Sequence, residues 1–390
     1  MQFLTDFVEQ VKAKNLYRQT VTYSPVSPAH VQLGGQTYLM LASNNYLGLT
    51  HNPVVQQAAI DAIRMYGTGA GGARLTTGTF PLFEQLEQEL AKFKETEDAV
   101  VFNTGYMANI GVISALAGPD DVIFSDEFNH ASIIDGCRLS RARVVVYRHN
   151  DMEHLQGLLT ATDCQGKRMI ITDGVFSMDG DIAPLDTIVE LAETVNAIVI
   201  VDDAHATGVL GPGGRGTAAY FGVKDKVQVQ IGTLSKALGA EGGFVAGSRA
   251  LIDYIKNRAR SFIFSTALAP STIAAALAAL RELSARPEMT VKLSENAQYV
   301  RTLLQAANLP VFNGITPIIP VMIGAADEAV KLTAELKMQG IIMTAIRPPT
   351  VPVGTSRLRL TVTAVHQREE LSTAVDTIIA AVKQPRTTVR

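Results

Sequence analysis

The fold is indicated by the stretch RMIITDGVFSMDGDIAPLDTIVELAETVNAIVIVDDAHATG, residues 168–208. Two short apolar runs, 168–176 and 197–204, flank the segment 185–196, whose apolar residues recur at helical spacing. A helix between two buried strands is the repeating unit of parallel sheets. This stretch therefore predicts an α/β architecture.

The same alternation continues on both sides of that stretch. Further strands are expected at DAVVFN, DVIFSD, RVVVY, VQVQIGTL and EGGFVAGS, with helices between most of them. From about residue 285 the order of helices and strands changes to an α+β pattern. We therefore expect an N-terminal helix with short strands over 1–45, a large α/β domain with a mostly parallel sheet over 46–285, and a small α+β domain over 286–390.

Composition and charge exclude several classes of protein. The chain has 390 residues, a net charge of −3 and 18% charged residues, which is ordinary for a globular protein and gives no reason to expect nucleic-acid binding. Cys137 and Cys164 stand at no metal-ligand spacing, which favours a reducing compartment.

The N-terminal segment is predicted to be an amphipathic helix packed on the body or on a partner subunit. Phe3, Leu4 and Phe7 follow helical spacing, but the segment lacks the basic start and apolar run of a signal peptide. No stretch of eighteen apolar residues occurs, so we expect no membrane span and a cytoplasmic location.

The segment GTGAGG, Gly67 to Gly72, matches a dinucleotide-binding pattern but stands in the wrong context. It follows an expected helix, whereas the pattern requires a strand before it. A close-packed loop is the better interpretation. The chain also contains no P-loop and no zinc motif.

Two segments point to chemistry that uses a lysine and a carboxylate. In IGTLSKALGAEGG, Lys236 follows an apolar strand among small residues, with the hydroxyls of Thr233 and Ser235 nearby, which suits a Schiff-base lysine as well as an ordinary surface lysine. In AIVIVDDAHATG, Asp202 and His205 follow a strand end, where α/β sheets bind ligands. The alternative role for Asp202 is capping of the next loop.

Three further segments supply candidates for binding. FNTGYMAN predicts a helix start, at Gly105 and Tyr106, that could hold a phosphate, and His130 stands at another helix start. In RLRL, Arg357 and Arg359 face one way, either to clamp a carboxylate or to meet water on an edge strand.

Together these segments resemble the α-oxoamine synthase family of pyridoxal-phosphate (PLP) enzymes. The resemblance runs from about residue 40 almost to the end, through SNNYLGL, NTGYMAN, NHASIIDG, DGVFSMDGDIAPL, VDDAHATGVLG, GTLSKALG, FSTALAP and RPPTVPVGTSRLRL. It implies the fold of the aspartate aminotransferase type (fold type I) and a homodimer with active sites at the subunit interface.

The resemblance also implies roles for individual residues. Lys236 would bind the cofactor covalently, Asp202 would face the pyridine nitrogen, His205 and Ser177 would lie at the ring hydroxyl, and His130 would stack on the ring. Of these, Lys236, Asp202, His205 and His130 are the expected catalytic residues.

The remaining implied roles concern the phosphate and the substrates. Gly105, Tyr106 and Thr233 would bind the phosphate, and Thr266 would reach it from the other subunit. The expected substrate-binding residues are Asn44, near the substrate, Arg359, at the amino-acid carboxylate, and Arg18, at the distal acyl carboxylate. Arg74, in GAGGARLTTG, has no assigned role.

The AIRPPTVPVGTSRLRL run is most similar to family members that condense L-alanine with a pimeloyl thioester, with loss of CO2, in biotin synthesis. The acyl carrier, coenzyme A or a carrier protein, stays open. Three alternatives remain: a glycine and acetyl-CoA reaction, an aminotransferase, and a non-catalytic regulatory subunit with the same fold.

Overall fold

The computed structural model describes residues 1–13 and 16–384, which form two compact units. The larger unit is Asn44–Ser294. The smaller unit joins Met1–Ser43 to the chain from Glu295 onward. The boundary between them falls inside helix α12, Glu288–Ala306.

The larger unit is built on a seven-stranded sheet with the strand order β4-β10-β9-β8-β7-β5-β6. Strands β9, β8, β7, β5 and β6 pair in parallel, while β10 is antiparallel to both of its neighbours. The bounds are β4 Asp98–Phe102, β5 Val122–Asp126, β6 Arg143–Tyr147, β7 Arg168–Asp173, β8 Ile198–Asp202, β9 Val229–Thr233 and β10 Gly243–Gly247. The predicted α/β class with a mostly parallel sheet is confirmed.

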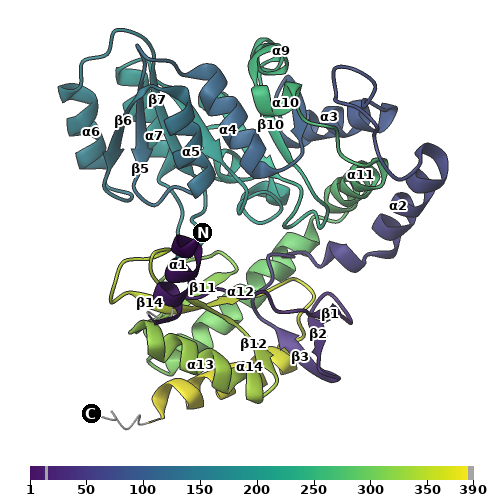
Figure 1. The fold of residues 1–390 in the computed structure, drawn as a ribbon, viewed down its shortest axis with the longest axis vertical. Coiled ribbons are helices and arrows are strands. Elements are labelled where there is room, and N and C mark those ends of the chain that lie inside the picture. Colours follow the sequence, from purple (N-terminus) through teal and green to yellow (C-terminus); the bar gives the residue numbers. More distant parts are fainter. Residues whose placement is uncertain (14–15, 385–390) are drawn as a thin grey trace. The chain divides into compact units, whose positions relative to one another are not determined.

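Helices cover both faces of this sheet because successive strand residues point to opposite sides (Figure 1). Ile200 packs in one apolar cluster and its neighbour Val201 in the other. The first cluster includes residues of α4 (Gly105–Leu116), α5 (Ala131–Ser140), α9 (Arg249–Arg258) and α10 (Arg260–Ile263). The second includes residues of α6 (Met152–Ala161), α7 (Leu185–Thr194) and α8 (Thr217–Tyr220).

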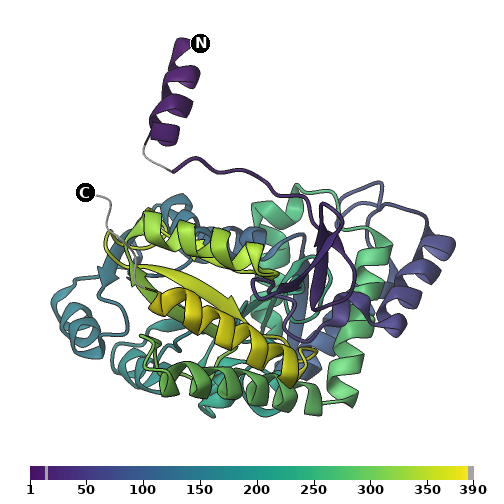
Figure 2. The same cartoon turned by 90° about the horizontal axis from the view of Figure 1, so that it is seen from below.

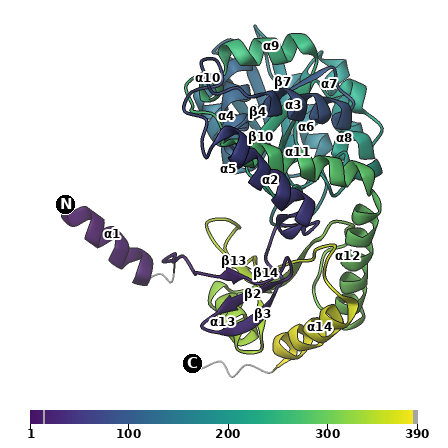
Figure 3. The ribbon, with the colours of Figure 1, turned by 90° about the vertical axis from the view of Figure 1, so that its right-hand side faces the viewer.

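Three more helices complete the larger unit. Helix α2 (Pro53–Tyr66), capped by the side chain of Asn52, lies beside α11 (Pro270–Ala285), as Figure 3 shows, and α3 (Pro81–Lys94) also contacts α11. The GTGAGG loop follows α2, which is a helix. The prediction that this loop lacks the strand of a dinucleotide-binding turn is therefore confirmed.

Arg74, which follows that loop, has a structural role. Its Nη1 donates to Glu87 Oε1 at 2.9 Å, its Nε donates to Thr79 Oγ1 at 3.0 Å, and its guanidinium lies 3.9 Å from the centre of the Phe83 ring. Glu87 in turn accepts a hydrogen bond from the backbone N–H of Val101. The Arg74 side chain thus ties the glycine-rich loop to α3 and to strand β4.

The smaller unit has the expected α+β character. It contains a sheet of order β1-β2-β3-β12 and an antiparallel sheet of order β11-β14-β13. In Figure 2 the yellow-green α13 and the yellow α14 run along the second sheet. The bounds are α1 Gln2–Ala13, β1 Ser24–Pro25, β2 His30–Leu33, β3 Gln36–Met40, β11 Ile318–Gly324, α13 Ala326–Met338, β12 Ile341–Ile342, β13 Thr344–Ile346, β14 Ser356–Thr361 and α14 Arg368–Lys383.

The position of strand β14 rules out one interpretation of the RLRL segment, that its arginines lie on an edge strand. Strand β14 is the middle strand of its sheet, so its arginines do not face water on an edge. Arg357 and Arg359 expose only 4% and 6% of their surface, and Leu358 and Leu360 are fully buried on the opposite face. The predicted alternation along RLRL is confirmed, and the interpretation as exposed edge charges is wrong.

Helix α1 forms as predicted, but none of its residues is buried within this chain. Across residues 1–13 and 16–384, no helix combines the length and the apolar character that crossing a membrane requires.

Candidate active site

Eight of the predicted site residues meet in one cavity of about 190 Å³ in the larger unit. The cavity lies at the carboxyl ends of β7, β8 and β9, where the strands deliver Asp173, Asp202 and Thr233. Its lining is Thr104, Gly105, Tyr106, Asn109, His130, Ser132, Asp173, Ser177, Asp202, Ala204, His205, Thr233, Ser235 and Lys236. Side chains of many sequence positions therefore converge where open α/β sheets bind ligands.

Asp202, in the motif VDDAH, is buried, and its carboxylate accepts hydrogen bonds from neutral donors. Its Oδ2 accepts a hydrogen bond from Asn109 Nδ2 at 2.6 Å, and its Oδ1 accepts one from the backbone N–H of Ala204 at 2.8 Å. Neither donor carries a charge. The carboxylate is thus oriented rigidly while its charge stays available to a cationic ligand.

Asp173 stands directly beside Asp202 in the parallel pairing of β7 and β8. Burial and then the like charge of Asp202 raise the pKa of Asp173 well above its ordinary value, against a hydrogen bond from the backbone N–H of His130 at 2.7 Å. Two adjacent buried carboxyls do not both ionise readily. The raised pKa favours the protonated form of Asp173 beside the Asp202 carboxylate.

His130 caps helix α5 and also faces the cavity. Its Nδ1 accepts a hydrogen bond from the backbone N–H of Ser132 at 3.2 Å. Burial lowers the pKa of His130, the Asp202 carboxylate opposes this, and the Lys236 ammonium adds to it. The lowered pKa favours a neutral ring, which suits stacking on a flat aromatic ligand.

His205 is oriented by a tyrosine from the SNNYLGL segment. The hydroxyl of the fully buried Tyr46 lies 2.6 Å from His205 Nδ1. Nδ1 is thus engaged by Tyr46, which fixes the orientation of the ring. Asn44 lies next to this pair, since Tyr46 hydrogen-bonds it through both its N–H and its hydroxyl.

The start of helix α4 forms one wall of the cavity. Thr104 caps the helix by accepting a hydrogen bond from the N–H of Met107, and Gly105 and Tyr106 occupy the first turn. The first N–H groups of a helix have no partner within it and attract anions. On the facing strand end, the hydroxyls of Thr233 and Ser235 lie 2.6 Å apart. Together they form a cradle of the kind that holds a phosphate.

These residues fit PLP. A buried carboxylate held by neutral donors suits a protonated pyridine nitrogen, a helix start with two hydroxyls suits the phosphate, and Lys236 lines the same cavity. Metal binding has no comparable support. Among the described residues, no group of three or more His, Cys, Asp or Glu side chains could hold an ion.

Four predicted residues are not part of the cavity lining. The backbone carbonyl of Thr266 accepts a hydrogen bond from Asn103 Nδ2 at 2.7 Å, and Asn44 lies behind Tyr46. Arg18 and Arg359 belong to the smaller unit, where Arg359 Nη1 donates to Thr361 Oγ1 at 3.0 Å.

Sequence reasoning missed several residues that hold the site together. Asn109 stands one helical turn after Gly105, so an inward orientation could have been inferred from the spacing in NTGYMAN. Asp173 ends a strand beside the strand of Asp202. Tyr46 gave no signal, because only the folded chain brings it to His205.

Comparison with known proteins agrees with this site. Residues 36–378 match the family described as aminotransferase class I and II. The chain is 50% identical to an 8-amino-7-oxononanoate synthase of Lysinibacillus sphaericus, over 97% of this chain and 96% of that protein, and 48% identical to one of Geobacter sulfurreducens, over 94% and 95%.

Solved structures give the same result. A serine palmitoyltransferase variant from S. paucimobilis with a bound PLP–myriocin aldimine is similar at a TM-score of 0.92 and 33% identity, covering 97% of this chain and 96% of that chain. An 8-amino-7-oxononanoate synthase from Francisella tularensis is similar at a TM-score of 0.77 and 30% identity, covering 89% and 98%. The predicted resemblance to α-oxoamine synthases is confirmed.

Proposed function

This chain belongs to the aminotransferase class I and II family, and we propose that it condenses L-alanine with a pimeloyl thioester to form 8-amino-7-oxononanoate for biotin synthesis. The observation that carries the proposal is the single cavity that gathers Lys236, Asp202, His205 and His130. The relatives of the same name support the choice of substrates, because they match nearly the full length of the chain at 46–50% identity.

The reaction joins the α-carbon of alanine to the acyl carbon of the thioester. The thiol of the carrier leaves, and the alanine carboxylate departs as CO2. The cofactor for this chemistry is PLP, whose ring withdraws electrons from the α-carbon. The carrier thiol is that of coenzyme A or of a carrier protein.

We assign each residue of the cavity a separate role toward the cofactor and the amino acid. The Lys236 amine, which lines the cavity, would anchor the cofactor and would also be the base available for the α-proton of alanine. Asp202 would keep the pyridine nitrogen protonated, and the neutral ring of His130 would stack on the cofactor. His205, which Tyr46 orients, and Ser177 line the same cavity and would bind the ring hydroxyl.

The phosphate and the substrates use other groups. Gly105, Tyr106 and Thr233, which line the cavity, would hold the cofactor phosphate at the start of α4. Asn44 and Arg359 bind the amino acid, with Arg359 as the carboxylate clamp. Arg18 contacts the distal carboxylate of the acyl chain.

We propose a homodimer in which Thr266 of each subunit reaches the cofactor phosphate of the other. Thr266 pairs with Ala73 in an isolated bridge, and an exposed apolar residue stands two positions from each of them in the sequence. Phe264 exposes 70% and Leu75 56% of their surface, which a second copy would cover. We further propose a cytoplasmic location, supported by two cysteines that form no disulfide.

The test is an absorbance titration of the purified protein with L-alanine, followed by pimeloyl-CoA. We expect a cofactor band that changes with alanine, release of CO2 with the thioester, and no turnover in Lys236→Ala. A protein without a cofactor band, or a Lys236→Ala variant with normal turnover, would contradict the proposal. A response to glycine and acetyl-CoA alone would replace the substrates and keep the family.

A non-catalytic subunit and an aminotransferase predict different results. The first would bind PLP and release no CO2. The second would convert alanine to a keto acid without a thioester. Because Lys236, Asp202 and His205 line one cavity, we expect neither result.

A further inference from the structure

Two loops bring ligand-facing residues to the cavity, and we name them here. The His130 loop, residues 127–130, connects β5 to α5 and carries His130. The Ser177 loop, residues 174–182, follows β7 and carries Ser177. Because His130 and Ser177 line the same cavity, the spacing of the two loops sets the spacing of these two side chains.

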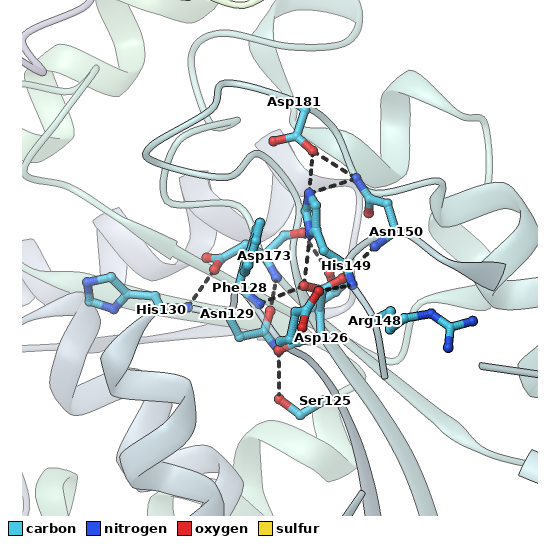
Figure 4. A network of polar contacts seen from close by, with 12 residues as sticks. Ser125, Asp126, Phe128, Asn129, His130, Arg148, His149, Asn150, Asp173 and Asp181 are labelled. Atoms are coloured by element: carbon cyan, nitrogen blue, oxygen red, sulfur yellow. Dashed lines mark hydrogen bonds and ion pairs between the residues drawn. The ribbon is translucent and has the colours of Figure 1, made fainter. Parts of the chain in front are cut away.

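His149 lies between the two loops and hydrogen-bonds a carboxylate on each side (Figure 4). Its Nδ1 is 2.9 Å from Asp126 Oδ1, next to the start of the His130 loop, and its Nε2 is 2.7 Å from Asp181 Oδ2, in the Ser177 loop. Since a carboxylate faces each ring nitrogen, both nitrogens donate, and the ring is an imidazolium. Burial lowers the pKa of His149, but the hydrogen bonds to Asp126 and Asp181 outweigh it and raise the pKa to about 10.

The ring of His149 also packs against an aromatic residue of each loop. It stacks on Phe128 of the His130 loop, with centroids 4.5 Å apart and planes at 24°, and meets Phe176 of the Ser177 loop edge-on at 4.4 Å. Phe128 is two residues from His130, and Phe176 is next to Ser177. Movement of either aromatic ring would therefore be transmitted directly to a residue that lines the cavity.

Neighbouring polar groups make both ends of this bridge rigid. Asn150 donates its backbone N–H to Asp126 Oδ2 at 3.0 Å and its side-chain Nδ2 to Asp181 Oδ2 at 2.8 Å. The backbone carbonyl of Asp181 accepts a hydrogen bond from the N–H of Phe176 at 3.0 Å. The carboxylate that His149 holds is thus fixed to the backbone of the residue before Ser177.

The His130 loop is anchored to the sheet at its other end. Asn129 donates to Ser125 Oγ at 2.9 Å and to the carbonyl of Ile171 at 2.8 Å, and its Oδ1 accepts from the N–H of Asp173 at 2.8 Å (Figure 4). The His130 loop is therefore fixed on β7. By contrast, the Asp181 carboxylate meets His149 and Asn150 across the gap between the loops.

We propose that the His149 imidazolium is a positioning residue, which holds the His130 loop and the Ser177 loop at the spacing that the cofactor ring requires. His149 does not line the cavity, so it acts through Phe128, Phe176 and Asp181. The inference rests on the proposed function, because it assumes that PLP binds in this cavity.

The test compares PLP binding in four variants of the holoenzyme. His149→Phe keeps an aromatic ring and removes both charged hydrogen bonds, His149→Gln retains one donor, and Asp181→Asn keeps the histidine and removes one carboxylate. His154→Gln is the matched control, since His154 is a half-buried histidine on α6 whose Nδ1 accepts from the N–H of Arg148 at 2.9 Å. The measurements are the dissociation constant of PLP, the ratio of the absorption bands of bound cofactor, kcat and KM for alanine, and thermal unfolding.

For His149→Phe we expect PLP to bind roughly 10- to 100-fold more weakly, by analogy with groups that orient metal ligands from outside the site. The absorption bands should change their ratio, since Ser177 faces the cofactor from the loop that moves. Asp181→Asn and His149→Gln should show smaller changes in the same direction, and His154→Gln should stay within about twofold of the wild type.

Two results would overturn the inference. One is a folded His149→Phe or Asp181→Asn protein with wild-type PLP affinity and wild-type absorption bands. The other is an equal change in His154→Gln, because the effect would then be general destabilisation. A wild-type protein that binds PLP without condensing alanine and the thioester would remove the proposed function alone, while the binding comparison would still decide the role of His149.

Discussion

Asp202 and Asp203 are consecutive residues at the end of one strand, yet they occupy opposite environments. The carboxylate of Asp202 faces the cavity and accepts hydrogen bonds from the neutral groups of Asn109 and Ala204. Asp203 points away and forms a fully buried ion pair with Lys94, whose Nζ is 2.7 Å from Asp203 Oδ2. Lys94 also donates to the carbonyl of Arg215 at 2.6 Å.

The Asp202 carboxylate faces the cavity, where a ligand can meet it, whereas the Asp203 carboxylate is neutralised by Lys94 inside the fold. The backbone N–H of Thr217 also approaches both oxygens of Asp203, so no acceptor capacity faces the cavity. The backbone carbonyl of Asp203 accepts hydrogen bonds from Ala206 and Thr207, which shapes the turn that carries His205. Asp203 thus builds the turn, while Asp202 serves the site.

The largest expected effect comes from Asp202→Asn, which removes the charge and keeps the shape. We expect kcat for alanine and pimeloyl-CoA to fall on the order of 100- to 1000-fold, because the cofactor nitrogen loses its charged partner. Stability should not fall, since the like charge beside Asp173 disappears. Steady-state kinetics and denaturant unfolding measure the two effects.

The control for this variant is Asp203→Asn, which should do the reverse and mainly destabilise the protein. If Asp203→Asn abolished turnover in a protein as stable as the wild type, the division of roles between the two carboxylates would be wrong.

Lys94→Met tests the same buried ion pair by removing the cation that neutralises Asp203. Removing the ammonium leaves the Asp203 carboxylate buried without its counter-charge, which costs about 3–5 kcal/mol of unfolding free energy. Turnover per folded molecule should change little. A loss below about 1 kcal/mol in a denaturant titration would show that the pair does not stabilise the turn.

A third expected effect concerns an ion pair whose cation loses its charge as the pH rises. His149 has a pKa of about 10 in the fold, against an ordinary value of 6.5, because of Asp126 and Asp181. The folded state therefore binds the proton more tightly, so the stabilisation is complete below about pH 6.5 and is lost as the pH rises toward 10.

This titration can be measured by denaturant unfolding at several pH values between 6.5 and 10. The wild type should lose stability across this interval, and His149→Phe should lose less. Parallel curves for the two proteins would contradict a charged His149.

Much of the fold could be predicted because strand and helix periods are local properties. The alternation from DAVVFN to EGGFVAGS predicted the sheet, and the mostly parallel class is confirmed. The antiparallel direction of β10 could not be read from its composition, since a short apolar strand has the same pattern in either direction. The burial of Arg357 and Arg359 also depended on pairing, because β14 lies between two partners.

In the candidate site, too, local sequence patterns identified some residues and folding was needed to identify others. Residues that stand next to strand ends and helix starts, such as Asp202, Lys236 and His130, could be identified from motifs. Tyr46 and His149 could not, because each acts on a residue from a distant segment. Arg74 was visible in the sequence, but its partner Glu87 and the ring of Phe83 appeared only after folding.

The sequence by itself determined the α/β class and the set of reactive residue types, because hydrophobic period and motif order are encoded along the chain. Only the tertiary structure explains why Asp202, and not its identical neighbour Asp203, lines the cavity. That choice depends on strand direction and on the partners that packing supplies: Asn109 from α4 for Asp202, and Lys94 from α3 for Asp203. The sequence determines which side chains can carry a charge, but the surrounding groups decide whether that charge is neutralised inside the protein or can meet a ligand.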